Sequence, residues 1–347
     1  MYKMFLPLLA IVGLLVPSQA LADSGDDEQL LDALDRACES VVLVSVRALV
    51  PSGAPAEVRE IQVTGSGFAI APGYVVTNYH VVENAAQIDV ILRSRQPGSA
   101  SVVGTAPGYD LALLKVPFDE RTLPPVSLGS SSDLRLGQTV LTVSNPLGLQ
   151  HSVSRGVVSG LQREISGLEI GARLIQFDAS INEGQSGGPL VDSRGSVVGV
   201  TTFKILGAEA IGFAIPIDLV RQTISDLERM GHPFRPEIGF SGTGVDPSLA
   251  SLFELPVVWG VLVEQVEDDS VAERAGLRAG HRIVTLHDKD YVLGGDIIVA
   301  VDDAPIVGPT GLIDSFLNAR PGQVLELEVV RGNKTVRIEL TVPEMVH

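Results

Sequence analysis

Residues 181–190 read INEGQSGGPL, a serine set among glycines in the middle of an otherwise apolar chain. Glycines on both sides allow the backbone to make a tight turn that presents the Ser186 hydroxyl. A serine hydroxyl is weakly acidic, so it becomes a nucleophile only beside a general base that a third group orients. The stretch is therefore either a nucleophile loop or a plain glycine-rich turn. Which of the two it is depends on whether a general base and an orienting group occur elsewhere in the sequence.

Length and composition set the frame. The chain has 347 residues, of which 45% are hydrophobic, enough for two ordinary domains with cores of their own. Its formal net charge of -17 disfavours nucleic acid and anionic lipid as partners. The one cysteine, Cys38, excludes an intramolecular disulfide. No metal-ligand cluster and no phosphate-binding glycine loop is present, so no metal or other cofactor is expected.

The first 22 residues have the pattern of a secretory signal. Lys3 precedes the apolar run FLPLLAIVGLLV at 5–16, and PSQALA ends in small residues at Ala22. The run has 12 residues, whereas about 20 are needed to span a bilayer. We therefore expect cleavage after Ala22, export, and no stable membrane span.

From Val41 to Pro216 the chain consists of short runs rich in Val, Ile and Thr, separated by Gly, Pro, Ser and Asn. No helical period separates these runs, so they predict an all-β barrel or sandwich. Ahead of them, the polar stretch 23–29 is expected to be loose. A short amphipathic lead-in helix, within a segment at 23–40, is predicted from the spacing of Leu30, Leu31, Leu34 and Cys38.

After Pro216 the apolar period becomes helical. Asp218 is the expected N-cap, and Gly231 follows the end of the helix. The predicted apolar face consists of Leu219, Val220, Ile224, Leu227 and Met230.

Two prolines then favour a linker, and the remaining segment has the size of a small domain. We thus place a first domain at 41–231, a linker at 232–236 and a second domain at 237–345.

The candidate general base is His80. After the signal segment, only His80 and His151 precede Ser186 in the chain. His80 ends a strand-like run, from which its side chain can project into a cleft. His151 is interpreted as a loop or strand-surface histidine, because no mechanism is attached to it.

The candidate orienting acid is Asp110. It follows a Pro-Gly turn and precedes an apolar strand, where a carboxylate is costly unless it is paired. Taken alone, Asp110 would be interpreted as an ordinary turn aspartate. The other candidates for the orienting acid are Asp89, Asp119, Asp133 and Asp178. The order His, Asp, Ser favours Asp110, since it is the chymotrypsin-type order of the triad.

The glycines around Ser186 have a mechanical purpose if Ser186 is a nucleophile. The backbone N–H groups of Gly184 and Ser186 must then point together at a developing oxyanion, in a turn free of bulky Cβ atoms. Together with TNYHVV and DLALLKV, the stretch favours a nucleophile.

Five longer segments carry a family resemblance. They are GSGFAIAPGYVVTNYHVV (65–82), YDLALLKV (109–116), VSNPLGLQHSVSRGVVSG (143–160), FDASINEGQSGGPLVD (177–192) and IGFAIPIDLV (211–220). They resemble the HtrA/Deg serine proteases of protein quality control, which have a chymotrypsin-like double β-barrel followed by one or two PDZ domains. The resemblance covers nearly the whole chain after the signal segment. It implies an all-β dominated fold, a periplasmic location, His80 as base, Asp110 as orienter, Ser186 as nucleophile, and an oxyanion hole at Gly184 and Ser186.

The resemblance implies further site residues and contains departures. Ile205 and Leu206 would line the primary specificity pocket and favour cleavage after small aliphatic residues, and Arg163 matches the activation-sensing arginine. Gln185 stands where the family usually has Asn, and Ser144 where Gly is common. Since neither side chain is the nucleophile or the base, activity is expected to survive.

The second domain resembles one PDZ domain, a partly open β-barrel with two helices that binds a peptide C-terminus as an added strand. The helices are expected in 270–277 and 309–319. An insertion around 281–294 is longer than in most bacterial PDZ domains and resembles that of plastid Deg proteases. By periodicity this domain begins with a plain strand; by resemblance, the carboxylate-binding loop is Glu237, Ile238, Gly239 and Phe240.

Two function classes follow. The first is an exported serine endopeptidase that cleaves unfolded or damaged proteins, with the PDZ domain selecting hydrophobic C-termini; a processing protease with one dedicated substrate has the same chemistry. The second is a chaperone, holdase or PDZ-based binding protein with little proteolysis. The family implies a homotrimer or higher homo-oligomer, but 23–40 lacks the aromatic residues that many members use to join three protease domains.

Overall fold

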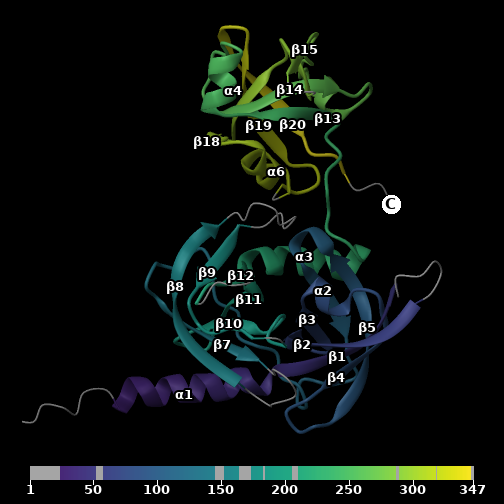
Figure 1. Cartoon of the computed structure of the whole chain (residues 1–347), viewed down its shortest axis with the longest axis vertical. Helices are drawn as coiled ribbons and strands as arrows, with labels where there is room; N and C mark the ends of the chain where they lie inside the picture. The colour runs from purple at the N-terminus through teal and green to yellow at the C-terminus, as the bar shows by residue number, and fades with distance from the viewer. Residues whose placement is uncertain are drawn as a thin grey trace, which may run out of the picture. The chain divides into compact units, whose positions relative to one another are not determined.

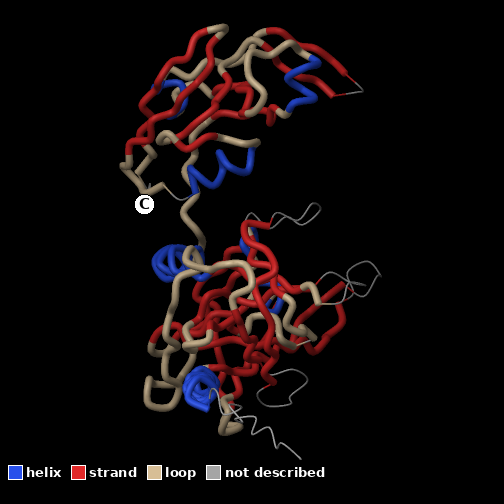
Figure 2. Tube along the Cα trace, turned by 90° about the vertical axis from the view of Figure 1, so that its left-hand side faces the viewer, coloured by secondary structure: helices blue, strands red, loops and turns tan. Residues whose placement is uncertain are grey.

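The computed structural model describes residues 24–51, 58–144, 152–163, 173–182, 184–204, 210–286, 289–317 and 319–344. The signal segment, Ile205 and Leu206 lie outside the described residues. Strands dominate the trace (Figure 2), as predicted. The chain divides into two compact units, a barrel unit and a sheet unit. In the described part of the chain, no helix is both long enough and apolar enough to cross a membrane.

The barrel unit contains two closed barrels of six strands each (Figure 1). The first has the order β1-β2-β3-β6-β5-β4. Its strands are β1 (Val41–Pro51), β2 (Val58–Ala71), β3 (Tyr74–Thr77), β4 (Ala85–Ile91), β5 (Pro97–Ala106) and β6 (Leu111–Lys115). Along β1, Val42, Val44 and Val46 are fully buried, because alternate side chains of a strand face the barrel interior.

The second barrel has the order β10-β11-β12-β9-β8-β7. Its strands are β7 (Thr139–Ser144), β8 (Ser152–Arg163), β9 (Leu174–Phe177), β10 (Pro189–Asp192), β11 (Val197–Lys204) and β12 (Gly212–Pro216). Phe177, Leu190 and Ala214 are fully buried in its core. The two closed barrels confirm the predicted all-β double barrel, and closure leaves neither with a free edge.

Helix α1 (Ser24–Glu39) precedes the first barrel and begins earlier than predicted. The polar stretch 23–29 is therefore helical from Ser24, not loose. Its buried face consists of Ala33, Ala37 and Cys38, whereas Leu31 is 61% exposed, so Leu31 does not belong to the apolar face. Burial raises the pKa of the Cys38 thiol, because an apolar setting disfavours the thiolate.

Helix α3 (Ile217–Met230) follows β12, and Gly231 ends it with φ +80° as predicted. Asp218 is not the N-cap, because it already lies in the first helical turn. Its carboxylate instead accepts hydrogen bonds from the Ser131 hydroxyl at 2.8 Å and from the N–H groups of Ser131 and Ser132, both at 3.0 Å. The carboxylate thus ties the start of α3 to the connection between β6 and β7.

The sheet unit contains a six-stranded antiparallel sheet with the order β13-β14-β17-β19-β20, and β18 pairs with β17. Its strands are β13 (Phe240–Val245), β14 (Gly260–Val266), β17 (Ile297–Val301), β18 (Ala304–Pro305), β19 (Val324–Arg331) and β20 (Lys334–Thr341). Helices α5 (Val271–Ala275) and α6 (Pro309–Leu317) lie in the two segments where helices were predicted.

Two features of the sheet unit were not predicted in this form. A third helix, α4 (Pro247–Leu252), begins at the N-cap Asp246, whose side chain accepts the N–H of Leu249. The insertion forms a separate hairpin of β15 (Arg282–Leu286) and β16 (Lys289–Leu293). The ring centroids of Phe253 and Tyr291 lie 5.2 Å apart, so the hairpin packs beside the end of α4.

Asp218→Asn is expected to destabilise the barrel unit at neutral pH by about 1 kcal/mol. Burial alone would raise the pKa of Asp218, but the hydrogen bonds from Ser131 and Ser132 and the charge of Arg221 outweigh it and leave the pKa lowered. A lowered pKa contributes stability above the unfolded value of about 4, and this contribution is lost as pH falls through the folded pKa.

The measurement is thermal unfolding of wild type and variant from pH 7 to pH 3, with Glu228→Gln, an exposed carboxylate on the same helix, as control. The gap between Asp218→Asn and wild type should close at the acid end. A gap that stays constant with pH would contradict this role.

Candidate active site

His80 and Asp110 meet at one end of the first barrel. His80 lies in the single helical turn α2 (Tyr79–Val82) directly after β3. Its Nδ1 lies 2.9 Å and 3.0 Å from the two carboxylate oxygens of Asp110. Because a carboxylate only accepts, Nδ1 carries the proton and Nε2 is left as the acceptor. The imidazole is 46% exposed while the carboxylate is 9% exposed, so the base is accessible and its orienter is not.

The backbone of Asp110 is held in an uncommon conformation. Asp110 follows a 3₁₀ turn at Pro107–Tyr109 and has φ +53°, in the left-handed region that aspartate tolerates better than most residues. The fully buried Asn78 donates from Nδ2 to the Asp110 carbonyl at 2.8 Å. The backbone N–H of His80 donates to the Asp110 carboxylate at 3.0 Å. These contacts point the carboxylate at the imidazole.

Thr202 connects Asp110 with Ser186. It lies on β11 of the second barrel and is 1% exposed. Its hydroxyl donates to Asp110 Oδ2 at 2.5 Å, and its carbonyl accepts the Ser186 hydroxyl at 2.7 Å. In the described structure the Ser186 hydroxyl is therefore bonded to Thr202, and no bond to His80 is present. The three predicted residues converge on one place, with Thr202 between two of them.

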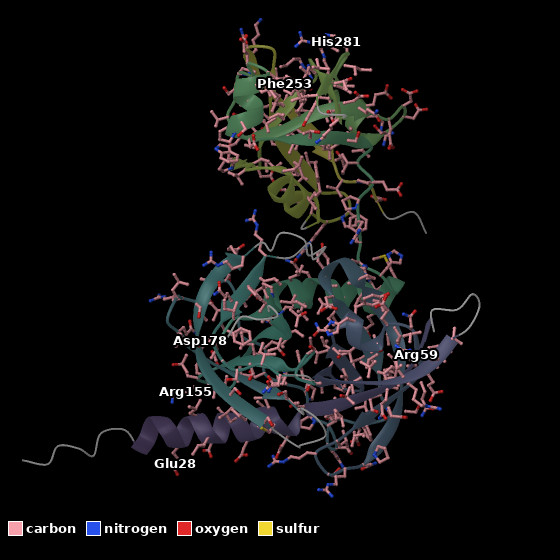
Figure 3. The ribbon with its side chains drawn as sticks, in the orientation of Figure 1. Glu28, Arg59, Arg155, Asp178, Phe253 and His281 are labelled. Atoms are coloured by element: carbon pink, nitrogen blue, oxygen red, sulfur yellow. The ribbon has the colours of Figure 1, made fainter. Side chains whose placement is uncertain are left out.

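The four rival aspartates lie elsewhere in the barrel unit. Within the described contacts none bonds to His80. Asp178, labelled in Figure 3, accepts the Val157 N–H at 2.6 Å. Of the candidates Asp89, Asp110, Asp119, Asp133 and Asp178, only Asp110 contacts the histidine in this part of the chain.

The loop around Ser186 turns through two left-handed glycines, Gly184 before the serine with φ +85° and Gly187 after it with φ +87°. Gln185 is 2% exposed, and its Oε1 accepts the N–H of Asn182 at 3.1 Å. The Gln185 N–H donates back to the Asn182 carbonyl at 3.2 Å. This reciprocal pair closes the loop over Gly184.

Of the other predicted site residues of the barrel unit, the structure describes Arg163. Arg163 ends β8, is exposed, and donates from Nε to Gln176 Oε1 at 3.1 Å. Ile205 and Leu206 are outside the described residues, so the structure says nothing of the predicted specificity pocket. Among the described residues, no cluster of three or more His, Cys, Asp or Glu could hold a metal ion.

In the sheet unit, Glu237–Phe240 leads into β13. The carbonyls of Ile238 and Gly239 accept the N–H groups of Ala272 and Glu267, both at 2.9 Å. Gly239 has φ +80°. Within the described contacts, the N–H groups of Ile238 and Gly239 donate to no other group. These two amides lie directly before β13, which is an edge strand of the sheet.

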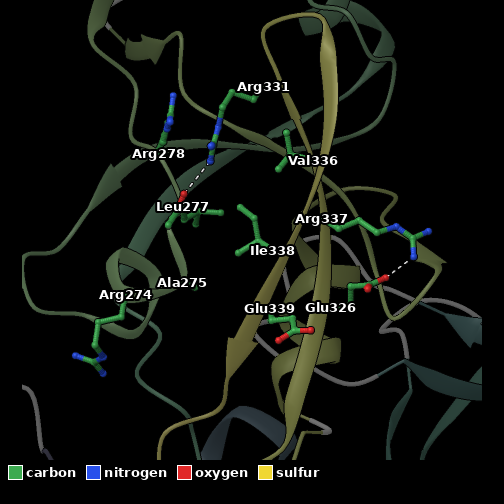
Figure 4. Close-up of a pocket in the computed structure, with 11 residues that line it drawn as sticks. Arg274, Ala275, Leu277, Arg278, Glu326, Arg331, Val336, Arg337, Ile338 and Glu339 are labelled. Carbon is green, nitrogen blue, oxygen red and sulfur yellow. Dashed lines mark hydrogen bonds and ion pairs between the residues drawn. The ribbon is translucent and has the colours of Figure 1, made fainter.

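A hollow of about 800 Å³ lies at the opposite edge, against α5, β19 and β20 (Figure 4). Arg331, one of its lining residues, donates to both carboxylate oxygens of the fully buried Asp296 at 2.7 Å and to the Gly276 carbonyl at 2.8 Å. The hydrogen bond and charge of Asp296 raise the pKa of Arg331. This pair joins α5, β17 and β19, so its evident role is structural.

Sequence reasoning missed Asn78 and Thr202. Asn78 lies inside the stretch TNYHVV quoted above and Thr202 lies in SVVGVTTF at 196–203, but a single polar residue in or beside a strand has no period that reveals its partner. The barrel unit consists of two closed six-stranded barrels, and His80, Asp110 and Ser186 come together where the two barrels meet. This arrangement defines the class of the chymotrypsin-like serine proteases. A second unit follows it in this chain.

Comparisons with known proteins identify the family. A trypsin-like peptidase domain model matches residues 65–200, and a PDZ domain model matches residues 236–342. A protease Do-like 1, chloroplastic, of Arabidopsis thaliana is 35% identical over 310 residues, covering 87% of this chain and 69% of that protein. A solved HtrA-type protease AlgW with decapeptide has 29% identity and a TM-score of 0.72, covering 92% of this chain and 99% of that one. The chain belongs to the HtrA/Deg family of serine proteases.

Some relatives are longer than this chain. A probable periplasmic serine endoprotease DegP-like of Pseudomonas fluorescens is 37% identical over 288 residues, covering 82% of this chain. The matched region spans 57% of that relative. The family, the double barrel and the single matched PDZ domain agree with what the sequence predicted.

Gly187→Ala is expected to destabilise the barrel unit strongly. A Cβ there would overlap the Ser66 carbonyl oxygen and lie 2.5 Å from Thr77 Oγ1, in addition to the strain of φ +87°. The control is Gly137→Ala, which has φ +80° and no atom within 4 Å of the added Cβ. The control should cost about 1 kcal/mol and Gly187→Ala at least about 2 kcal/mol more. The midpoints and free energies of urea unfolding measure both, and equal losses would contradict the close approach.

Proposed function

We propose that this chain is an exported serine endopeptidase of protein quality control that cleaves unfolded or damaged proteins. The observation that carries the proposal is the arrangement in which Asp110 orients His80 through Nδ1 while Thr202 contacts both Asp110 and Ser186. Family membership supports the same chemistry, and the periplasmic naming of the Pseudomonas relative supports export of this chain.

In the proposed reaction, Ser186 Oγ attacks the scissile carbonyl carbon and transfers its proton to His80 Nε2. The carbonyl electron pair moves to the oxygen, and the N–H groups of Gly184 and Ser186 donate hydrogen bonds to the oxyanion that forms. The C–N bond then breaks and His80 returns the proton to the leaving amine. Water repeats the sequence on the acyl-enzyme and releases the second product.

One step must precede attack. The Ser186 hydroxyl has to rotate from the Thr202 carbonyl to His80 Nε2, and this leaves a buried carbonyl without its donor. An unsatisfied buried acceptor is costly, so an extended substrate that offers a backbone N–H to Thr202 would favour the rotation. Substrate binding and release of the nucleophile are then coupled.

The remaining roles follow the family. Ile205 and Leu206 would line the specificity pocket, Arg163 would sense activation, and Glu237–Phe240 would bind the terminal carboxylate of a hydrophobic peptide. The two N–H groups at Ile238 and Gly239 support the last of these. The domain limits 41–231 and 237–345 and a homotrimer or higher oligomer belong to the same proposal.

A second candidate is a chaperone or PDZ-based binding protein with little proteolysis. The bond of the Ser186 hydroxyl to Thr202 favours it, since a serine held away from its base is unreactive. The two functions differ in turnover, which makes the nucleophile variant decisive.

Ser186→Ala should abolish cleavage of reduced casein, lowering kcat/KM by roughly 10⁴-fold or more, while unfolding and peptide binding stay unchanged. Cleavage is measured by gel and by a fluorogenic peptide, with a hydrophobic C-terminal peptide added or withheld. Turnover retained in the variant would exclude Ser186 as nucleophile. Wild type that binds casein but never cleaves it, even with the peptide, would favour the binding protein.

Gly239→Ala should weaken binding of a hydrophobic C-terminal peptide at least about tenfold. A Cβ at φ +80° would overlap Ser270 and displace the loop that carries the two amides. Gly322→Ala is the matched control, with φ +78° and nothing within 4 Å. Isothermal titration measures Kd for each. Equal affinities in the two variants would place peptide binding elsewhere.

A further inference from the structure

Ser66, on strand β2, reaches from the first barrel to the loop that carries Ser186. It is fully buried within the stretch GSGF at 65–68. Its hydroxyl donates to the Gly184 carbonyl at 2.7 Å, and its N–H donates to the Ser186 carbonyl at 2.8 Å. Its own carbonyl accepts the Thr77 hydroxyl at 2.7 Å. Ser66 thus forms hydrogen bonds with the loop on both sides of Gln185.

These contacts fix the peptide planes beside the proposed oxyanion hole. A peptide unit is planar, and its C=O and N–H point in opposite directions. The bond to the Gly184 carbonyl orients the unit between 184 and 185. The bond to the Ser186 carbonyl orients the unit between 186 and 187. The unit that carries the Ser186 N–H lies between these two.

Thr201 completes the constraint from the second barrel. Its hydroxyl lies 2.8 Å from the Gln185 carbonyl, which belongs to the same peptide unit as the Ser186 N–H. The Ser186 N–H therefore points away from Thr201. In the described contacts, the N–H groups of Gly184 and Ser186 donate to no other group, so both are available to an oxyanion.

The glycine spacing around Ser66 permits this close contact. A Cβ at Gly65 would lie 2.6 Å from a Val81 methyl and 3.2 Å from the Ser186 carbonyl oxygen. A Cβ at Gly187 would overlap the Ser66 carbonyl. The strand and the loop approach each other only because these positions lack side chains.

We propose that Ser66 is a positioning residue for the oxyanion hole: its hydroxyl and its N–H hold the peptide units on either side of the one that carries the Ser186 N–H, so that this N–H meets the oxyanion together with the N–H of Gly184. This proposal rests on the proposed peptidase function. Without the hydroxyl, the Gly184 carbonyl loses a buried donor, and a glycine adopts other orientations at low cost. The contact stabilises the transition state more than the bound substrate, because it acts through groups that meet the oxyanion.

Ser66→Ala is the test, with two inhibitors as readouts. A peptide aldehyde forms a tetrahedral adduct with Ser186 and requires the oxyanion hole, whereas the corresponding peptide alcohol binds without forming it. Affinities of both are measured by calorimetry, which requires no turnover, beside kcat and KM on a fluorogenic peptide. The control is Ser45→Ala on the neighbouring strand β1, whose hydroxyl accepts only from Gln62 in the described contacts.

Ser66→Ala is expected to lower kcat roughly 10- to 100-fold, with KM and the pH midpoint of activity nearly unchanged. Aldehyde affinity should fall by a similar factor while alcohol affinity stays constant, and Ser45→Ala should resemble wild type. If Ser66→Ala does not fold, Ser66→Cys, similar in size but a weak donor, should show the same selective loss.

A constant ratio of aldehyde to alcohol affinity in a folded variant would overturn the role and leave Ser66 a structural residue. That failure differs from failure of the proposed function, which would appear as turnover in Ser186→Ala. If Ser186→Ala is inactive and Ser66→Ala is fully active, the peptidase stands and the positioning role does not.

Discussion

The carboxylate of Asp110 is the constraint on which the arrangement of the two barrels depends. A buried charge is costly unless it is fully paired, and this one takes donors from both barrels. His80 supplies two hydrogen bonds from the first barrel, and Thr202 supplies one from the second. Separating the barrels would leave the carboxylate short of a donor. The pairing of this buried charge therefore links the two barrels at the place where chemistry is proposed.

Three residues at this interface have backbone conformations in the left-handed region. Asp110, Gly184 and Gly187 all have positive φ, and each is held by hydrogen bonds from another segment. The glycines adopt this conformation without strain, whereas at Asp110 it is strained and persists because the surrounding buried strands of the closed barrels determine it. The stable barrels thus hold these three residues at positive φ, and this backbone geometry orients the carboxylate of Asp110 and the amides beside Ser186.

The sequence predicted most of the helices and strands and the three residues of the proposed triad, His80, Asp110 and Ser186. Strand runs, a helical period and the order His, Asp, Ser are visible along the chain. It could not predict the residues that hold them. The Thr202 hydroxyl meets a carboxylate 92 positions away, and the Ser66 hydroxyl meets a carbonyl 118 positions away. Asp218 was misassigned for the same reason, since a local rule named it a cap while partners 87 positions away, at Ser131, occupy its carboxylate. Helix α4 was missed because its six residues are too short to show a period.

Gln185 illustrates how a departure from the family pattern is accommodated. Its longer side chain reaches back to the N–H of Asn182 while its own N–H donates to the Asn182 carbonyl, a reciprocal pair comparable with a capping box. This local closure fixes the two ends of the turn, and the contact from Ser66 fixes its centre. Only one of these hydrogen bonds, the one to Asn182 N–H, requires an acceptor on the side chain of residue 185. The identity of residue 185 is therefore less constrained than the spacing of the glycines beside it, because only the glycines allow the strand to approach.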